Sequence, residues 1–276
     1  MAFADGATGP LWYQLEGAGE VVVLTGGWGL TDKQFENVTP LLAERYRVLN
    51  WSWRGIGRSH RDVPGPQSLE DWADDLATVL DHAGVERAYL WGTSSGGMVS
   101  LLHAARRPEQ VAGVATWVQL YANEGFQRAF ALFPEVIAVF GWDGLSILLS
   151  WLGLGSDVLL SEQGVEFARW ERVVLAGNLE PEALAAVCAA VARADVRPVL
   201  GSVRVPVTAL AGTDGSLGLE GDYGAPALAE LLRHVPHATV SPVAGASGTY
   251  FLAERPAESV VVFTAWVDSL RAALGP

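Results

Sequence analysis

The chain has 276 residues, half of them hydrophobic, so it can bury one large core and is too apolar to be disordered. Its 31 acidic residues outnumber 18 basic ones, and the net charge of −13 argues against nucleic acid or an anionic membrane as a partner. The single cysteine, Cys188, excludes an internal disulfide, and no basic region followed by an apolar stretch opens the sequence, so we expect a cytoplasmic protein.

Apolar runs and helical patterns alternate through the first 120 residues. We predict short strands at residues 11–15, 21–24, 47–53, 87–91 and 112–120. We predict helices at residues 34–44, from Ser68 onward, and from a glycine-rich turn at 92–97 to Arg106. Ser68 and Asp71 form the capping pattern that begins the second of these helices. Because strands and helices alternate, the pattern predicts a parallel sheet with right-handed crossovers.

The alternation stops between residues 121 and 201, which have helical patterns rich in alanine, leucine and tryptophan. Within this segment the most apolar stretch, 136–154, is broken by Gly141, Asp143 and Gly144, which favours a buried pair of helices over a membrane span. The alternation then resumes. We predict strands at 205–210 and 238–243, a helix at 226–233, and a final helix with apolar residues from Val260 to Leu274.

The turn at residues 92–97, Gly-Thr-Ser-Ser-Gly-Gly, lies between a predicted strand and a predicted helix. This context matches the G-x-S-x-G nucleophile elbow, with Ser94 at its apex. Gly92 and Gly96 must be small because strand and helix pass close together there. The backbone amide of Ser95, at the start of the helix, can bind a developing oxyanion.

Two other interpretations of this turn were weighed. A glycine-serine loop can merely link a strand to a helix, and the pentapeptide alone does not distinguish that role from a catalytic one. A phosphate-binding loop is disfavoured, because no Gly-Lys-Ser/Thr follows and Lys33 is the only lysine in the chain.

The order of these parts resembles the α/β-hydrolase superfamily over nearly the whole chain. The resemblance implies an α/β fold with a doubly wound, mostly parallel sheet, in which residues 1–120 and 202–276 form the core and residues 121–201 an inserted helical cap. It implies Ser94 as the nucleophile. Residues 26–28, Gly-Gly-Trp, stand where the family has His-Gly-x, so the oxyanion hole would be made by the amides of Trp28 and Ser95.

The catalytic triad of the family is degenerate in this chain. Gly248 stands where the resemblance places the histidine, and glycine cannot take the proton of a serine hydroxyl. Asp214 is the candidate catalytic acid, although it stands one residue before the usual position. Glu124 is an alternative acid, because some family members carry the acid after the sixth strand. We expect none of the five histidines to replace the missing base, and His60, which follows the Arg-Gly-Ile-Gly loop, is the most plausible of them.

Aromatic residues indicate the kind of ligand. The chain has 11 tryptophans, and several fall in or face the predicted cap, which suits an apolar or aromatic small molecule, although most tryptophans simply belong to a core. The candidate substrate-binding residues are Trp117, Gln119, Tyr121, Trp142, Trp151 and Tyr250. We expect no cofactor, metal ion, nucleic acid or membrane partner, and a homodimer stays open.

Three functions remain open from the sequence. We favour an enzyme that uses the oxyanion hole for non-hydrolytic chemistry, such as cyclisation, rearrangement or elimination, in the biosynthesis of a specialised metabolite. The first alternative is an ester or lactone hydrolase in which the histidine has been replaced naturally or by engineering. The second is a small-molecule binder without catalysis, in which the elbow is kept because the fold requires it.

Overall fold

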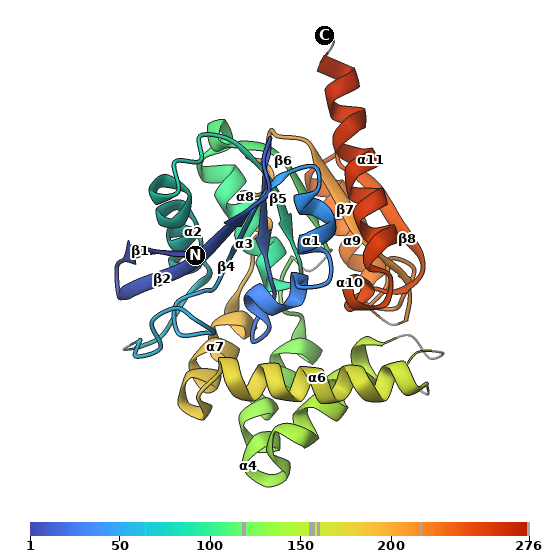
Figure 1. The fold of residues 1–276 in the computed structure, drawn as a ribbon. Coiled ribbons are helices and arrows are strands. Elements are labelled where there is room, and N and C mark those ends of the chain that lie inside the picture. The colour runs from blue at the N-terminus through green and yellow to red at the C-terminus, as the bar shows by residue number, and fades with distance from the viewer. Residues whose placement is uncertain (64, 118–119, 155–157, 159–160, 216, 275–276) are drawn as a thin grey trace.

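An eight-stranded sheet forms the centre of the molecule. The computed structural model describes residues 1–63, 65–117, 120–154, 158, 161–215 and 217–274 (Figure 1). The strands are β1 (Ala2–Gly6), β2 (Gly9–Glu16), β3 (Val21–Thr25), β4 (Arg47–Trp51), β5 (Ala88–Gly92), β6 (Val111–Thr116), β7 (Val207–Asp214) and β8 (Thr239–Ser247). Their order is β1-β2-β4-β3-β5-β6-β7-β8. From β4 to β8 all neighbours are parallel, whereas β1 and β2 pair antiparallel at one edge, which confirms the predicted mostly parallel sheet.

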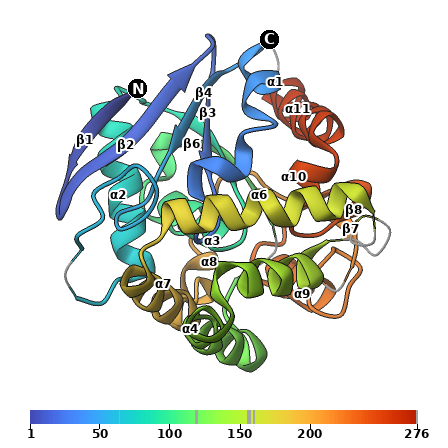
Figure 2. The ribbon, with the colours of Figure 1, turned by 60° about the horizontal axis from the view of Figure 1, so that its bottom comes forward.

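Helices cover both faces of this sheet. The helical elements are η1 (Thr31–Phe35), α1 (Thr39–Ala43), α2 (Leu69–His82), α3 (Ser95–Arg106), η2 (Pro108–Gln110), α4 (Glu124–Gly153), α6 (Glu162–Asn178), α7 (Pro181–Arg193), α8 (Arg197–Leu200), α9 (Gly224–His234), α10 (Phe251–Glu254) and α11 (Pro256–Leu274). The helices α2, α3, α8 and α9 pack along one face, and α1, α10 and α11 along the other (Figures 1 and 2). Because β3 lies between two covered faces, Val22, Val23 and Leu24 are fully buried.

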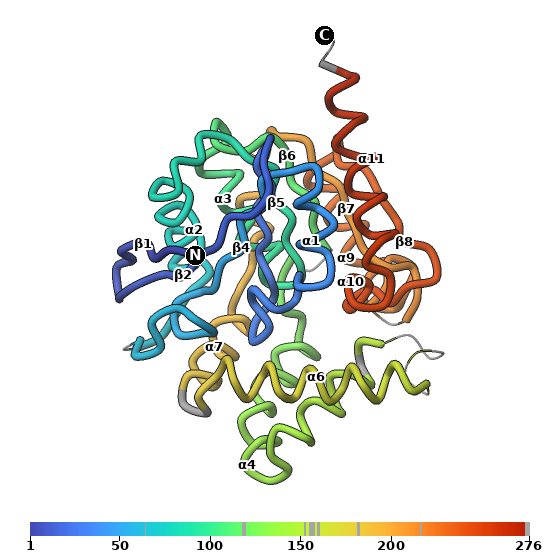
Figure 3. Tube along the Cα trace, in the orientation of Figure 1, coloured from blue at the N-terminus to red at the C-terminus, as the bar shows by residue number. Residues whose placement is uncertain are grey.

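The helices α4, α6 and α7, here called the cap helices, form a separate layer. The chain leaves the sheet after β6, passes through this layer and returns to β7, as the tube in Figure 3 shows. They lie below the end of the sheet at which β5 leads into α3 (Figure 1). The division at residues 121 and 201 into a core and a cap stays a prediction.

The apolar stretch of α4 differs from the expectation in one respect. Gly141 has φ 66° and ψ −171°, which is not helical, so α4 is two helices joined at a kink, as predicted. The stretch is buried on one side only, however: Leu145 and Leu154 belong to the core, whereas Val139, Phe140 and Trp151 are 71%, 68% and 66% exposed. The prediction of a buried pair was therefore wrong, since the outer face of α4 has no described neighbour to cover it.

By length and composition alone, one helix of the described chain is apolar enough to cross a membrane. It is Glu124–Trp151 within α4, and 17% of its most apolar window is buried inside the protein. The kink at Gly141 interrupts this helix.

The remaining differences concern element boundaries. The capping pattern before α2 is confirmed, because Ser68 and Asp71 exchange side-chain to backbone hydrogen bonds in both directions. The helix expected at 34–44 is instead a short 3-10 turn, η1, followed by α1, since Pro40 cannot donate a backbone hydrogen bond within one continuous helix. The strand expected at 112–120 ends at Thr116, and β1 was not predicted at all.

Candidate active site

Ser94 occupies a sharp turn between the end of β5 and the start of α3. Its backbone is strained, with φ 51° and ψ −129°, a conformation that non-glycine residues rarely adopt. The turn leaves no room for side chains on the two flanking glycines. A Cβ on Gly92 would lie 2.5 Å from the carbonyl oxygen of Gly96, and one on Gly96 would lie 2.1 Å from that of Thr25. The predicted elbow is thus present.

The two predicted oxyanion donors meet beside this elbow. The backbone N–H of Trp28 donates to the side-chain oxygen of Ser95 at 3.0 Å, and the amide of Ser95 lies in the first turn of α3. Gln34 fixes the loop that carries Trp28, because its Oε1 accepts from the Gly27 amide at 2.7 Å and from the Thr93 hydroxyl at 2.8 Å. The sequence did not single out Gln34.

Ser94 opens into a small cavity of about 40 Å³ that lies between the core and the cap helices. Its described lining residues are Gly27, Trp28, Leu30, Gln34, Ser94, Leu149, Glu171, Leu175, Thr249 and Tyr250. The structure therefore brings together the predicted nucleophile, one predicted oxyanion residue and Tyr250. This volume holds a water-sized group or the reacting atoms of a substrate, but not a whole substrate.

Glu171, on α6, is the functional candidate that sequence reasoning missed. Its side chain is fully buried and lines the cavity. Its Oε1 accepts from the hydroxyl of Tyr250 at 2.5 Å, and its Oε2 accepts from the hydroxyls of Ser146 and Ser150 at 3.3 Å each. Burial raises the pKa of the Glu171 carboxyl to about 7, while these hydroxyls act in the opposite direction. The hydroxyl of Tyr250, a predicted substrate-binding residue, donates to this carboxylate instead.

The position expected for the histidine has no space for a side chain. A Cβ on Gly248 would lie 2.0 Å from the carbonyl oxygen of Leu217 and 2.4 Å from the Cα of Gly218, both backbone atoms. The Gly248 amide also donates to the carbonyl of Asp214 at 3.1 Å. The ends of β7 and β8 are thus packed backbone against backbone.

All five histidines are described, and none lines the cavity of Ser94. His82 contacts the hydroxyl of Tyr13 and His103 contacts Gln110, with burial lowering the pKa of His103 to about 4. The others lie against Gly9 (His60), Glu230 (His234) and the carbonyl of Val205 (His237).

Neither candidate acid lines the described cavity. Asp214 is the last residue of β7 and is exposed, and its carboxylate accepts from the hydroxyl of Thr213 at 2.6 Å. Glu124 begins α4, where it is 77% exposed and pairs with Arg128 one turn later. The role of each acid stays a prediction.

The predicted substrate-binding residues are distributed over several places. Trp117 and Tyr121 line a different cavity of about 200 Å³, together with Phe126 and Tyr223. Trp142 packs against the core from α4, and Trp151 is exposed. Gln119 lies outside the described residues. Among the residues of this set that the structure describes, Tyr250 alone lines the cavity of Ser94.

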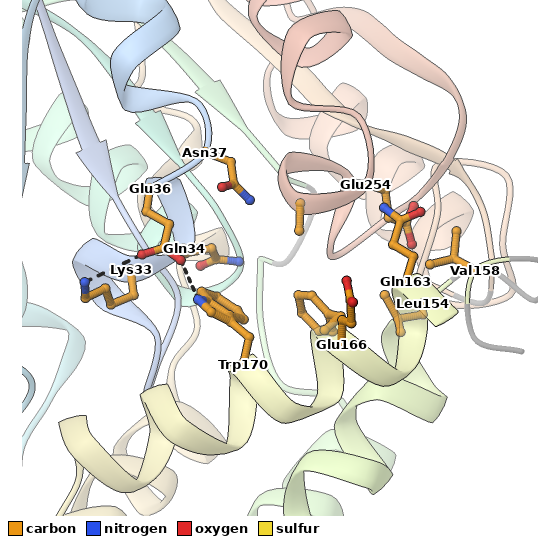
Figure 4. A pocket seen from close by; sticks show the side chains of 12 residues that line it. Lys33, Gln34, Glu36, Asn37, Leu154, Val158, Gln163, Glu166, Trp170 and Glu254 are labelled. Atoms are coloured by element: carbon orange, nitrogen blue, oxygen red, sulfur yellow. Dashed lines mark hydrogen bonds and ion pairs between the residues drawn. The ribbon is translucent and has the colours of Figure 1, made fainter. Parts of the chain in front are cut away.

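A third cavity, of about 230 Å³, lies next to the site between η1 and α6 (Figure 4). Gln34 lines both this cavity and that of Ser94. Trp170 and Phe167 contribute aromatic surface from α6, and the indole N–H of Trp170 donates to Glu36 across the cavity mouth. Within the described chain, no group of three or more acidic, histidine or cysteine side chains could hold a metal ion.

The strand order, the strained serine between β5 and α3 and the amides beside it define an enzyme of the α/β-hydrolase family, to which this chain belongs. A family model described as the alpha/beta hydrolase fold matches residues 20–137. Among curated relatives, the pimeloyl-[acyl-carrier protein] methyl ester esterase of Sodalis glossinidius is 30% identical over 73% of this chain and 78% of its own length. RutD of Azorhizobium caulinodans, whose name assigns it carbamate hydrolysis, is 35% identical over 51% of this chain.

This match with RutD spans about half of that relative's length, 53%. Solved structures share the fold across the whole chain. An esterase from Thermogutta terrifontis aligns with a TM-score of 0.83 at 21% identity, covering 98% of both chains. An enol-lactonase from Burkholderia xenovorans aligns with a TM-score of 0.79 at 22% identity, covering 98% of this chain and all of its own.

Proposed function

We propose that this protein is a serine hydrolase that cleaves an ester, lactone or carbamate bond in a small apolar or aromatic molecule. The observation that carries the proposal is the strained backbone of Ser94, held beside the amides of Trp28 and Ser95. Strain of this kind costs roughly 1–3 kcal/mol and is retained where a side chain must project into a site. A serine that only linked a strand to a helix would not need it.

The names of similar proteins support hydrolysis over the non-hydrolytic chemistry that the sequence favoured. The relatives are named for cleavage of a methyl ester and of a carbamate, and the structural neighbour for cleavage of a lactone. These bonds share one chemistry, the attack of an oxygen nucleophile on an acyl carbon. The structural neighbour, at 22% identity, supports the fold and no more.

The geometry gives each residue a step in this chemistry. The Ser94 oxygen attacks the acyl carbon, and negative charge develops on the acyl oxygen. The amides of Trp28 and Ser95 bind that oxygen, once the hydroxyl of Ser95 has left the Trp28 amide. The bond between the acyl carbon and the leaving group breaks, which leaves the acyl group on Ser94, and water then hydrolyses this acyl-enzyme.

The surroundings of the site favour an apolar substrate. The indole of Trp28 stacks on Phe133 and meets the edge of Phe130, both from α4. The adjoining cavity beside Trp170 is large enough for a small acyl or alcohol group. The net charge of −13 and the single buried cysteine, Cys188, are compatible with the rest of the proposal, a cytoplasmic enzyme without a nucleic-acid partner.

The test is replacement of Ser94, assayed with p-nitrophenyl esters of graded acyl length and with a fluorophosphonate probe. We expect the Ser94→Ala enzyme to lose at least about 10³-fold in kcat/KM and all labelling by the probe. Ser100→Ala is the matched control, because Ser100 lies further along α3, does not line the cavity, and donates to the carbonyl of Gly96. Equal rates for wild type and Ser94→Ala would rule out the proposal.

One observation favours a second candidate, the non-hydrolytic enzyme that the sequence suggested. Gly248 leaves no space for an imidazole, so the site contains an oxyanion hole without the usual base. The same fact argues against a histidine removed by engineering, since the surrounding backbone closes on the glycine. If the enzyme is non-hydrolytic, the wild type would form no adduct at Ser94, and Ser94→Ala would keep most of its activity on the true substrate.

A further inference from the structure

Glu171 is a buried acid that the cap helices place in the cavity of the nucleophile, and the proposed function leaves it without a role. Resting on that function, we propose that the carboxyl group of Glu171 transfers the protons of the reaction at Ser94. It would thus do the work of the histidine that the loop after β8 cannot carry.

Hydrogen bonds fix the position of the Glu171 carboxylate. The hydroxyl of Tyr250 donates to Oε1 at 2.5 Å, and those of Ser150 and Ser146 contact Oε2 at 3.3 Å, so the carboxylate is held from both sides. The contact of Ser146 is the weaker one, because its hydroxyl also donates to the carbonyl of Ala168 at 2.6 Å. A carboxylate can accept about four hydrogen bonds, so these three contacts leave capacity for a further proton donor. Ser94 lines that same cavity of about 40 Å³, so both side chains border the space in which a substrate would react.

No cation neutralises Glu171 among the described residues. Tyr250 is the only titratable side chain among the described residues that bond the Glu171 carboxylate. Burial, together with the negative charge of Glu171, raises the pKa of the Tyr250 phenol well above its usual value. From α4 the facing groups are the neutral Ser146 and Ser150. The adjacent Arg172 turns to the surface, where it pairs with Asp143.

An acid buried without a cation is costly to keep, and a purely apolar residue would fill the same position more cheaply. Its pKa of about 7 is the value at which one group can both accept and return a proton at neutral pH. Burial and hydroxyl contacts together thus give Glu171 the property that a general base needs.

The proton balance closes with water as the only co-reactant. In acylation the Ser94 proton passes to the Glu171 carboxylate as the oxygen–carbon bond forms, and the carboxylic acid then protonates the leaving oxygen. In deacylation a water gives its proton to Glu171 and its oxygen to the acyl carbon, the bond to Ser94 breaks, and the proton returns to the serine oxygen. The net reaction consumes one ester and one water.

The experiment compares Glu171→Gln with wild type in ester hydrolysis and in fluorophosphonate labelling across pH 5–9. The wild-type rates should rise with pH through a pKa near 7, because the ionised carboxylate is the active form. Glu171→Gln should lose roughly 10²- to 10⁴-fold and show no such rise. Glu162→Gln, the same change at an exposed position of α6, should behave as wild type.

Tyr250→Phe gives a second measurement that does not depend on the stability of Glu171→Gln. The Tyr250 hydroxyl stabilises the ionised carboxylate, so its removal should raise the pKa of Glu171 and move the rise in rate to higher pH. A residue with a merely structural role would leave the pH profile where it is.

The outcomes separate this inference from the proposed function. If Ser94→Ala is inactive while Glu171→Gln stays within about threefold of wild type and keeps the same pH profile, the role of Glu171 is disproved and the hydrolase stands. If Ser94 is labelled in a Glu171-dependent way but no ester is hydrolysed, the inference stands and the function is wrong. Absence of any labelling at Ser94 disproves both.

Discussion

A single carboxylate, that of Glu171, connects the chemistry of this site to the stability of the protein. Its pKa of about 7 in the folded state lies above the value of 4.5 for an unperturbed glutamate, because burial penalises the charged form. The folded state therefore binds the proton more tightly than the unfolded state does. The stability contributed by this group is fully present below pH 4.5 and is lost as the pH rises through 7.

We predict that Glu171→Gln removes this dependence on pH. Relative to the variant, wild type should lose roughly 3 kcal/mol of unfolding free energy between pH 4 and pH 8, since each unit of pKa shift corresponds to about 1.4 kcal/mol. Urea unfolding of both proteins at the two pH values measures the difference. A constant difference would contradict the assigned pKa.

The residues of the elbow could be predicted from sequence, but Glu171 could not. Ser94, Trp28 and Ser95 belong to short motifs whose spacing is fixed by the backbone, so the pattern alone identifies them. Glu171 belongs to no motif. Its signal is an acid on the same helical face as Phe167 and Leu175, four residues to either side, where an apolar residue is expected.

At the scale of elements, the ends of β7 and β8 leave no space for a side chain at Gly248, where the family resemblance places the histidine. The two strands remain paired as far as Asp214 and Ser247, and the Gly248 amide continues the bonding to Asp214. A loop that presents a histidine would need Gly248 to carry a side chain, and Leu217 and Gly218 occupy that space. The tight packing of this edge therefore excludes an imidazole at residue 248.

We predict that Gly248→Ala destabilises the protein by roughly 1–3 kcal/mol, because the new Cβ would meet backbone atoms that cannot rotate away. Gly201→Ala is the control: a Cβ there meets nothing within 4 Å, and its φ is negative, so the change should be neutral or slightly stabilising. Chemical unfolding measures both. Equal stability of the two variants would show that the backbone around Gly248 adapts easily.

The elements that were predicted well carry strong local signals. The capping box of α2 and the continuous apolar run of β3 are examples, since each is decided by neighbouring residues. By contrast, β1 has few large apolar residues and is a strand because β2 pairs with it, which a local pattern does not reveal.

At the scale of the whole molecule, Asn178 connects the cap helices to the loop that carries Trp28, here called the oxyanion loop. It lies at the end of α6, where its side-chain amide donates to the carbonyl of Gly29 at 2.9 Å and to that of Leu30 at 3.3 Å. Its own carbonyl accepts from the Gly57 amide. One residue thus joins α6 to the segment that follows Trp28.

We predict that Asn178→Ala costs roughly 1–3 kcal/mol of stability, because the carbonyl of Gly29 loses its side-chain donor, whereas that of Leu30 keeps the amide of Lys33. It should also lower kcat/KM by about 10- to 100-fold through displacement of the Trp28 amide. Glu180→Gln, which removes an exposed ion pair with Arg61 nearby, should change stability by less than about 1 kcal/mol. Unchanged kinetics in Asn178→Ala would show that the oxyanion loop holds its position without the cap helices.

The contact between the Ser95 hydroxyl and the Trp28 amide bears on which ligands the enzyme can favour. A neutral carbonyl oxygen of a substrate must displace the Ser95 hydroxyl from the Trp28 N–H. The two hydrogen bonds are of similar strength, so the substrate gains little affinity from the exchange. An oxygen that carries negative charge binds the same N–H about twice as strongly and wins the exchange. In the proposed reaction, competition from the hydroxyl of Ser95 therefore weakens binding of the neutral substrate more than binding of the negatively charged transition state.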